Sequence, residues 1–323
     1  MTDTLVVECV GGLTNRLMAL TSGLRLANIY GMAFKIAWEP ATECGAEFSD
    51  LFSNLFDTVS PRDRGDYPNA IHIGHGAHGW NVDPVLARPP LGENFWLTTH
   101  GIITHPHEPR NRSFFPDDGV IFDIGRYSRV LRPNGSVQAT VDSIEFDPCN
   151  TVSLHIRRPY SRDVKISDGA HANEQRLYGS ISDDYFAGIV EAILRQDARL
   201  RVLLSTNSEE TQAVIKARFG DKVITYAKSS NALDTSQVNS ARDALVDIIL
   251  MSKTAGIVRQ VDTHFGLYAS LINQTPNLVI IRNDDREPDL GFLRFGDNQQ
   301  MEFDRSDKAL PRFCERNINM LRY

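Results

Sequence analysis

The clearest pattern in the chain is a regular alternation of apolar runs and amphipathic segments from residue 151 onward. The runs are rich in Val, Ile and Leu, and the segments between them carry apolar residues at helical spacing. Strands are expected at 151–156, 201–205, 222–226, 256–259 and 277–281, and helices at 183–196, 209–219, 241–252 and 265–273. Strands alternating with such helices indicate βαβ units, and hence a doubly wound parallel sheet.

The N-terminal part begins with the same kind of unit. A β-branched run at 4–10 is followed by two glycines, a leucine-rich segment of helical spacing at 15–30, and a second apolar run at 33–38. From 60 to 135 frequent Pro and Gly interrupt the pattern, so we expect only short strands and loops there. The polar tail after 283 is expected to pack across the surface.

These patterns predict an α/β protein with two Rossmann-like domains. A length of 323 residues suits two domains of about 150 residues each. We place the boundary before the first strand of the regular half. The expected domains are therefore 1–148 and 149–323.

Composition narrows the class of protein. Hydrophobic residues make up 41% of the chain, which is typical of a globular protein, and the net charge of −7 argues against general affinity for nucleic acid. The four cysteines are dispersed and form no CxxC pair, which favours reduced thiols. With neither a signal-peptide core nor a membrane-spanning run, we expect a cytoplasmic protein, with a peripheral position at the inner membrane face as a further expectation.

The most informative motif is His155-Ile156-Arg157-Arg158, which closes the strand expected at 151–156. Two arginines at a strand end are costly to bury, and a guanidinium offers a fork of donors that matches phosphate oxygens. Ligands of open α/β sheets bind beyond the carboxyl ends of strands. The motif therefore predicts a phosphate site. Ion pairing of the arginines with nearby carboxylates is the alternative, with about equal weight.

Three other segments offer weaker signals. Gly11-Gly12-Leu13-Thr14-Asn15-Arg16 lies between a strand and a helix, where amides favour an anion, although a plain tight turn explains it equally well. Asp247 stands among apolar residues and needs a partner. Thr263, after the strand at 256–259, either caps the next helix or contacts a phosphate.

The histidines do not indicate a metal site. His72, His75 and His78 lie in a glycine-rich stretch that no helix would present together, and no Cys or carboxylate completes a ligand set. The chain also contains no Asp-x-Asp, the usual clamp for a divalent metal on a sugar nucleotide. We therefore expect no metal and no resident cofactor.

Taken together, these motifs resemble the superfamily of α-1,6-fucosyltransferases and protein O-fucosyltransferases, in the style of bacterial nodulation fucosyltransferases. The match rests on order and spacing, since each motif alone is modest. The matching segments are residues 11–17, Trp38 with 44–52, 155–158, and 244–252 followed by 262–266.

The resemblance implies a GT-B arrangement, in which two α/β domains face a central cleft. The N-terminal domain would take the acceptor, and the C-terminal domain would hold a GDP-sugar. It implies an inverting, metal-independent transfer of a sugar, with fucose foremost, to a glycan or lipid-linked acceptor. Arg157 would hold the β-phosphate, His155 and Asp247 would contact guanine, and Thr263 would add a phosphate contact. The remaining donor-site candidates are Gly12, Asn15, Arg16 and Arg158.

The chain also departs from the family pattern. Pro159-Tyr160 replaces the usual Thr-Asp after the arginines, which leaves the identity of the sugar open. No motif fixes the base that deprotonates the acceptor, so Asp163 is the first candidate and Glu174 the second, with ion pairing to Arg158 or Arg162 as the alternative for Asp163. A catalytically degenerate nucleotide- or glycan-binding protein is the competing function.

Overall fold

The computed structural model describes residues 3–67, 69–73, 94–99, 124–159, 172, 175–179, 181–228, 234–260, 263–273, 275, 277–280, 292–295 and 301–304. The chain divides into two compact units. The first consists mainly of Met1–Ala139 and Thr235–Leu245, and the second mainly of Thr140–Asp234 and Val246–Gly296. Because each unit is built from more than one segment of the chain, we describe the units by their sheets. The boundary after residue 148 stays a prediction.

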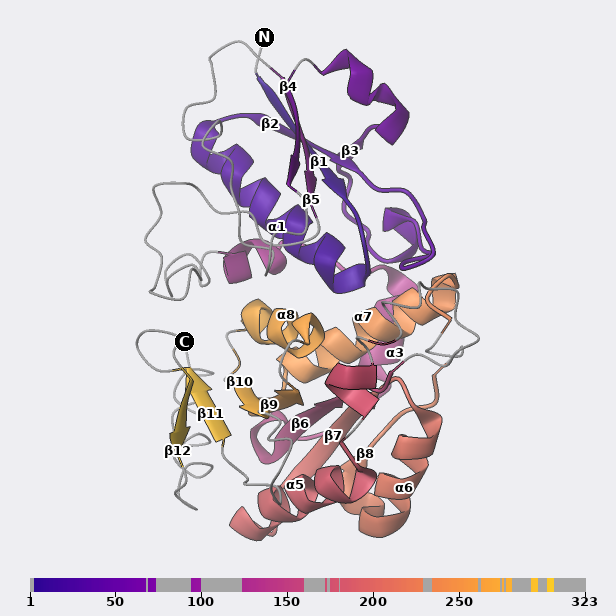
Figure 1. Cartoon of the computed structure of the whole chain (residues 1–323), viewed down its shortest axis with the longest axis vertical. Coiled ribbons are helices and arrows are strands. Elements are labelled where there is room, and N and C mark those ends of the chain that lie inside the picture. Colours follow the sequence, from indigo (N-terminus) through magenta and orange to yellow (C-terminus); the bar gives the residue numbers. More distant parts are fainter. Residues whose placement is uncertain are drawn as a thin grey trace. The chain divides into compact units, whose positions relative to one another are not determined.

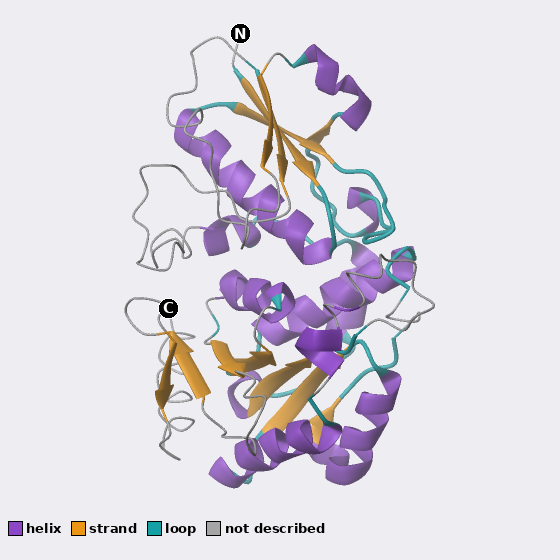
Figure 2. Cartoon of the chain, viewed as in Figure 1, coloured by secondary structure: helices purple, strands orange, loops and turns teal. Residues whose placement is uncertain are grey.

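The first unit is built on a five-stranded sheet with the order β3-β2-β1-β5-β4, in which every pairing is parallel (Figures 1 and 2). Its strands are β1 (Thr4–Cys9), β2 (Ala33–Ala37), β3 (Asp57–Thr58), β4 (Asn69–Ile73) and β5 (Phe95–Thr99). Its helical segments include α1 (Leu13–Tyr30), the 3-10 turns η1 (Phe48–Asp50) and η2 (Pro61–Asp66), the start of α3 (Gly135–Asp142) and the first part of α7 (Val238–Ser252).

Glycines set the path between β1 and α1. Gly11 has a φ of 80°, a left-handed conformation that favours glycine, and Gly31 ends α1 with a φ of 65°. Gly23 lets α1 lie close to β1, because a Cβ there would come within 2.4 Å of the Val7 side chain. The glycines therefore have a structural role in this unit, because they allow the turn after β1 and the close packing of α1.

The second unit contains a seven-stranded sheet with the order β12-β11-β10-β9-β6-β7-β8. Its strands are β6 (Thr151–Ile156), β7 (Arg201–Thr206), β8 (Val223–Ile224), β9 (Gly256–Gln260), β10 (Asn277–Ile280), β11 (Phe292–Phe295) and β12 (Met301–Asp304). Its helices are α5 (Asp183–Gln196), α6 (Glu209–Phe219), α8 (His264–Asn273) and the later part of α7 (Val238–Ser252). It also contains the 3-10 turns η4 (Pro148–Asn150) and η6 (Gly220–Lys222) and the short π-helix η5 (Gln175–Gly179).

The two faces of this sheet differ in chemistry. α5 and α6 lie on one face and α7 and α8 on the other (Figure 1). Along β6, Val152, Leu154 and Ile156 join the apolar core with α5. The alternate residues Ser153 and His155 project to the opposite face, because strand side chains alternate. The strand is buried on both faces, and its polar residues all face α7 and α8.

The sequence predicted most of these elements. The α/β class is confirmed, and β6, α5 and α6 have the expected bounds. The expectation for the tail was incomplete, because residues after 283 include β11 and β12, which extend the sheet by antiparallel pairing. The placement of the two units across a central cleft stays a prediction.

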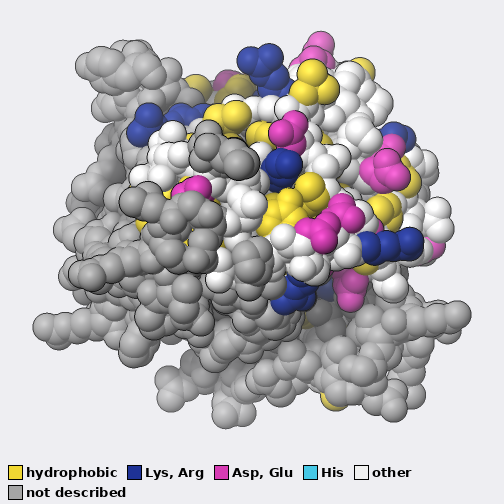
Figure 3. Space-filling view, turned by 90° about the horizontal axis from the view of Figure 1, so that it is seen from above, with side chains coloured by type: hydrophobic (Ala, Val, Ile, Leu, Met, Phe, Trp, Pro, Cys, Tyr) yellow, Lys and Arg dark blue, Asp and Glu magenta, His cyan; other side chains and the backbone are white. Residues whose placement is uncertain are grey.

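Three described cysteines, Cys9, Cys44 and Cys149, are free thiols, and burial raises the pKa of Cys9 to about 12. No helix in the described part of the chain is long and apolar enough to cross a membrane. Seen from above the view of Figure 1, the described Lys and Arg side chains are interspersed with Asp and Glu (Figure 3).

Candidate functional site

The second sheet reverses its strand order between β6 and β9. From β6 the chain proceeds outward to β7 and β8, and it then returns to β9 on the other side of β6. Ligands of doubly wound sheets bind beyond the carboxyl ends of the strands at such a switch point. His155 and Arg157 lie at the end of β6, and Gln260 and Thr263 lie at the end of β9, so the topology gathers them at this place.

Three neighbouring strands carry a row of buried polar side chains. His155 in β6 is in register with Ser205 in β7 and with Arg259 in β9. Residues in register on neighbouring strands project to the same face of a sheet. Here that face packs against α8, because the rings of His155 and Phe265 stack with centroids 5.0 Å apart. All three polar residues are buried, so the row depends on internal partners.

The imidazole of His155 is held neutral. Burial lowers its pKa to about 3, and the positive charges of Arg157, Lys228 and Arg259 act in the same direction. Its Nδ1 is buried and has no hydrogen-bond partner among the described residues. A buried nitrogen without a partner costs about 1–3 kcal/mol, so His155 offers this atom to a ligand.

Asp247 is held by two side chains of the same unit. Its Oδ2 accepts hydrogen bonds from Ser205 Oγ at 2.9 Å and from Lys228 Nζ at 2.6 Å. Lys228 also donates to the carbonyl of Thr206. The side chains of Lys228 and Asp247 are only 16% and 6% exposed. The partner that the sequence required for Asp247 is therefore Lys228, and the pair fixes the carboxylate in one orientation.

The two arginines of the motif have different surroundings. Arg158 forms an ion pair with Asp183 and donates to the carbonyl of Ile181 and to Thr211 Oγ1. Asn207 brackets the Arg158 backbone, accepting from its N–H at 2.7 Å and donating to its carbonyl at 2.8 Å. Arg158 is therefore engaged in an ion pair, which is the alternative to a phosphate site that the sequence left open. Its guanidinium links the end of β6 to α5 and α6.

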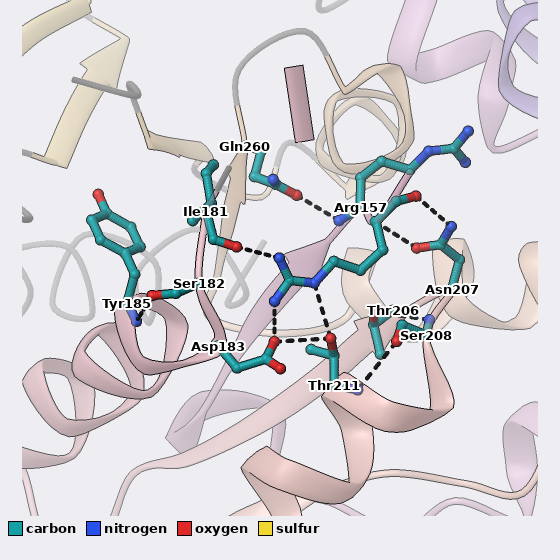
Figure 4. Close-up of polar contacts among 11 residues, drawn as sticks. Arg157, Ile181, Ser182, Asp183, Tyr185, Thr206, Asn207, Ser208, Thr211 and Gln260 are labelled. Carbon is teal, nitrogen blue, oxygen red and sulfur yellow. Dashed lines mark hydrogen bonds and ion pairs between the residues drawn. The ribbon is translucent and has the colours of Figure 1, made fainter. Parts of the chain in front are cut away.

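The Arg157 side chain points away from this network (Figure 4). Its guanidinium carbon lies 5.9 Å from the centroid of the Tyr178 ring, within the range of a cation–π contact. Its backbone N–H donates to Gln260 Oε1, which links the end of β6 to the end of β9. Arg157 is therefore the arginine whose fork is directed away from the core of the unit.

Thr263 precedes α8 and is buried. Its hydroxyl donates to the carbonyl of Gln260 at 2.8 Å, and Arg259 Nη1 donates to the carbonyls of Gln260 and Thr263. A hydroxyl that already donates its single proton has no second one for a phosphate. Any phosphate contact here therefore falls to backbone amides at the start of α8.

The other donor-site candidates belong to the first unit. Arg16 is buried, donates to the carbonyls of Gly11 and Glu39, and lies over the Trp38 ring. These contacts lock the glycine turn. Gly12 precedes α1 as its N-cap, and Asn15 is half-buried in the first turn. A role of these residues in donor binding stays a prediction.

Several predicted residues lie outside the described part of the chain. These are Asp163, Glu174, His75 and His78. Among the described residues, no three His, Cys, Asp or Glu side chains are grouped as a metal site would require.

Known structures bear on the fold. The sequence matches no protein-family model and no curated protein. A NodZ α-1,6-fucosyltransferase soaked with GDP-fucose aligns over 87% of this chain and 95% of its own, with a TM-score of 0.55 and 14% identity. A variant of Arabidopsis thaliana FUT1 in complex with GDP aligns over 91% and 74%, with a TM-score of 0.59 and 14% identity. POFUT1 in complex with GDP aligns over 86% and 98%, with a TM-score of 0.51 and 10% identity.

The chain has the fold of these fucosyltransferases. The resemblance drawn from the four motifs is thereby confirmed for the fold, over most of the length of the chain.

Sequence reasoning missed four residues of this site: Ser205, Lys228, Arg259 and Gln260. Ser205 and Arg259 could have been identified from the sequence, because each is a polar residue near the end of a mainly apolar strand. Lys228 gave none, since it follows a short strand as one lysine among many polar residues. Only the fold brings it to Asp247.

We expect His155 to make the stability of the protein depend on pH. Its pKa is about 3 in the folded chain and about 6.5 when unfolded, so between these values only the unfolded chain binds the proton. Its contribution is complete above pH 6.5 and declines as the pH falls toward 3, by at most about 1.4 kcal/mol per pH unit. In urea unfolding at pH 7, 6 and 5, the free energy of unfolding should fall less steeply with decreasing pH for His155→Gln than for the wild type.

The exposed His264 provides the control. The free energy of unfolding of His264→Gln should depend on pH as that of the wild type does. Equal slopes for the wild type and His155→Gln would contradict the neutral, buried state of His155.

Proposed function

We propose that the protein is an inverting, metal-independent glycosyltransferase that moves a sugar, fucose foremost, from a GDP-sugar to a glycan or lipid-linked acceptor. The observation that carries this proposal is the buried polar row at the switch point, where the cations Arg157, Lys228 and Arg259 surround a neutral His155. In the same fold, NodZ was soaked with GDP-fucose, and FUT1 and POFUT1 were each determined with GDP.

Arg157 is assigned to the diphosphate. As the bond between the anomeric carbon and the phosphate oxygen breaks, the departing GDP gains negative charge. Without a metal, preorganised donors must stabilise that charge, and a guanidinium suits it best. Arg158 acts indirectly, because its contacts with Asp183 and Asn207 fix the strand end from which Arg157 projects.

Asp247 and His155 are assigned to the guanine base. A carboxylate is the natural acceptor for the two neighbouring N–H groups on the guanine edge. Ser205 and Lys228 both bind Oδ2, and we assign Oδ1 to the base. His155, on strand β6, adds its unpartnered Nδ1 as a second contact to the base. Thr263 is assigned to the phosphates only through the backbone amides at the start of α8, because its hydroxyl already donates to the carbonyl of Gln260.

A ligand screen tests the proposed function. GDP at a hundredfold excess over its Kd should stabilise the wild type by about 2.7 kcal/mol, whereas UDP and ADP should have smaller effects. Thermal unfolding with each nucleotide measures this preference for GDP. In Asp247→Asn the difference in stabilisation between GDP and ADP should become smaller. GDP-fucose should then be turned over with a glycan acceptor panel, and EDTA should not reduce the rate.

The outcomes of this screen separate the alternatives. GDP binding without turnover of any GDP-sugar would favour a degenerate binding protein. No preference for guanine would exclude the proposed donor. Loss of activity in EDTA that Mn²⁺ restores would contradict the metal independence.

Arg157→Ala should lower kcat/KM by a factor of about thirty or more, because it removes a charged donor from the leaving diphosphate. This factor corresponds to a loss of at least ~2 kcal/mol in transition-state stabilisation. Arg157→Lys should recover little, since the fork geometry is lost. Arg199→Ala is the control, because Arg199 is an exposed arginine paired with Asp197. Near-wild-type kcat/KM in both Arg157 variants would exclude this assignment.

Asp163 is proposed as the base that takes the acceptor proton, since it lies six residues after Arg157 in the segment leaving the same strand end. Asp163→Asn keeps the size of the side chain and removes the base. We expect kcat to fall by ~10² to 10⁴ while GDP affinity stays unchanged. A loss of GDP affinity with kcat preserved would instead assign Asp163 to orienting the arginines.

A further inference from the structure

Gln260 has a carboxamide whose two ends do different things. The residue ends β9 and is only 1% exposed. Its Oε1 accepts the backbone N–H of Arg157, and Figure 4 shows this oxygen directed at that nitrogen. Because an N–H can only donate, the oxygen must be the near atom. The contact therefore fixes the orientation of the carboxamide and turns Nε2 away from Arg157.

The Nε2 group has no partner. It is buried, and no described residue accepts a hydrogen bond from it. Such a donor is costly to bury, and a packing role alone would be met by an apolar side chain. The other unpartnered nitrogen of this region, His155 Nδ1, lies on the adjacent strand β6. Because Gln260 follows Arg259 in β9, it projects to the face opposite His155, so the two unpartnered nitrogens adjoin the ends of β6 and β9 from opposite faces. Polar ligands of such sheets bind beyond these strand ends.

The surrounding charge indicates which kind of atom Nε2 meets. Nε2 is a donor, so its partner must be an acceptor. Arg157, Lys228 and Arg259 place three cations around these strand ends, and Asp247 is the carboxylate that pairs with one of them. The nearby start of α8 also favours negative charge. An anionic oxygen fits these surroundings better than a sugar hydroxyl does.

We propose that Gln260 binds the donor nucleotide, with Nε2 donating to an oxygen of its diphosphate while Oε1 fixes the backbone of Arg157. The inference rests on the proposed function and names a residue outside the motif segments that carried the resemblance. One side chain thereby holds the anion and positions the arginine that neutralises it. The carboxamide has no charge to lose, so this contact persists over the whole working pH range.

Gln260→Glu tests the donor directly. The glutamate can still accept the Arg157 N–H, but it sets a carboxylate against the diphosphate. We expect GDP affinity at pH 8, measured by calorimetry, to fall at least about tenfold, because a hydrogen bond to a charged group is replaced by repulsion. Guanosine affinity should stay within about twofold. Lowering the pH toward 5.5 should restore part of the GDP affinity, since a protonated glutamate donates again.

Gln260→Leu is the second variant, because it removes the donor without adding a charge. It should also lose GDP affinity selectively over guanosine. Thr151→Val is the matched control: Thr151 Oγ1 is likewise buried without a partner, but it lies at the opposite end of β6. This variant should bind GDP like the wild type.

The results separate the two levels of the proposal. A wild type that binds no GDP would overturn the proposed function and this inference together. Wild-type GDP affinity in both Gln260 variants would overturn only the inference, as would an equal loss for GDP and guanosine. A selective loss for GDP-fucose with GDP unchanged would place Nε2 on the sugar and also contradict the diphosphate contact.

Discussion

The burial of positive charge at the carboxyl ends of β6 and β9 is the constraint on which the site depends. Arg259 and Lys228 are largely withdrawn from water, and Arg157 projects from the same place. Buried cations are stable only with partners, and the pair of Lys228 with Asp247 satisfies one of them. Burial lowers the pKa of His155, and the same positive charges act in that direction, so its imidazole is neutral.

The adjacent arginines differ because their side chains leave the end of β6 in different directions. The Arg158 side chain projects toward α5 and α6, where Asp183 and Thr211 bind its guanidinium. Arg157 projects toward Tyr178. Arg158 thus secures the strand end, and the guanidinium of Arg157 lies against the Tyr178 ring instead. A strand end held this firmly suits the role proposed for Arg157, in which a preorganised donor stabilises charge that develops on a leaving group.

The regular half of the chain was the part most readily predicted from sequence. Buried parallel strands are continuous apolar runs, and amphipathic helices show their period, so both signals are local. The antiparallel pair β11–β12 was missed because its strands lie in a polar tail. The motif at 155–158 was recognised as a site, but its two arginines look identical in sequence. Their different partners come from α5, α6 and η5, which lie tens of residues away.

The sequence by itself determined the α/β class, the order of its elements and the strand end that carries the candidate site, because hydrophobic periodicity and turn residues act over a few positions. Only the tertiary structure decided that Ser205, His155 and Arg259 form one row, that Lys228 is the partner of Asp247, and that Gln260 meets Arg157. The two hydrogen bonds among these contacts join residues 19 and 103 positions apart. Their physical cause is strand register and helix packing, which no local pattern encodes.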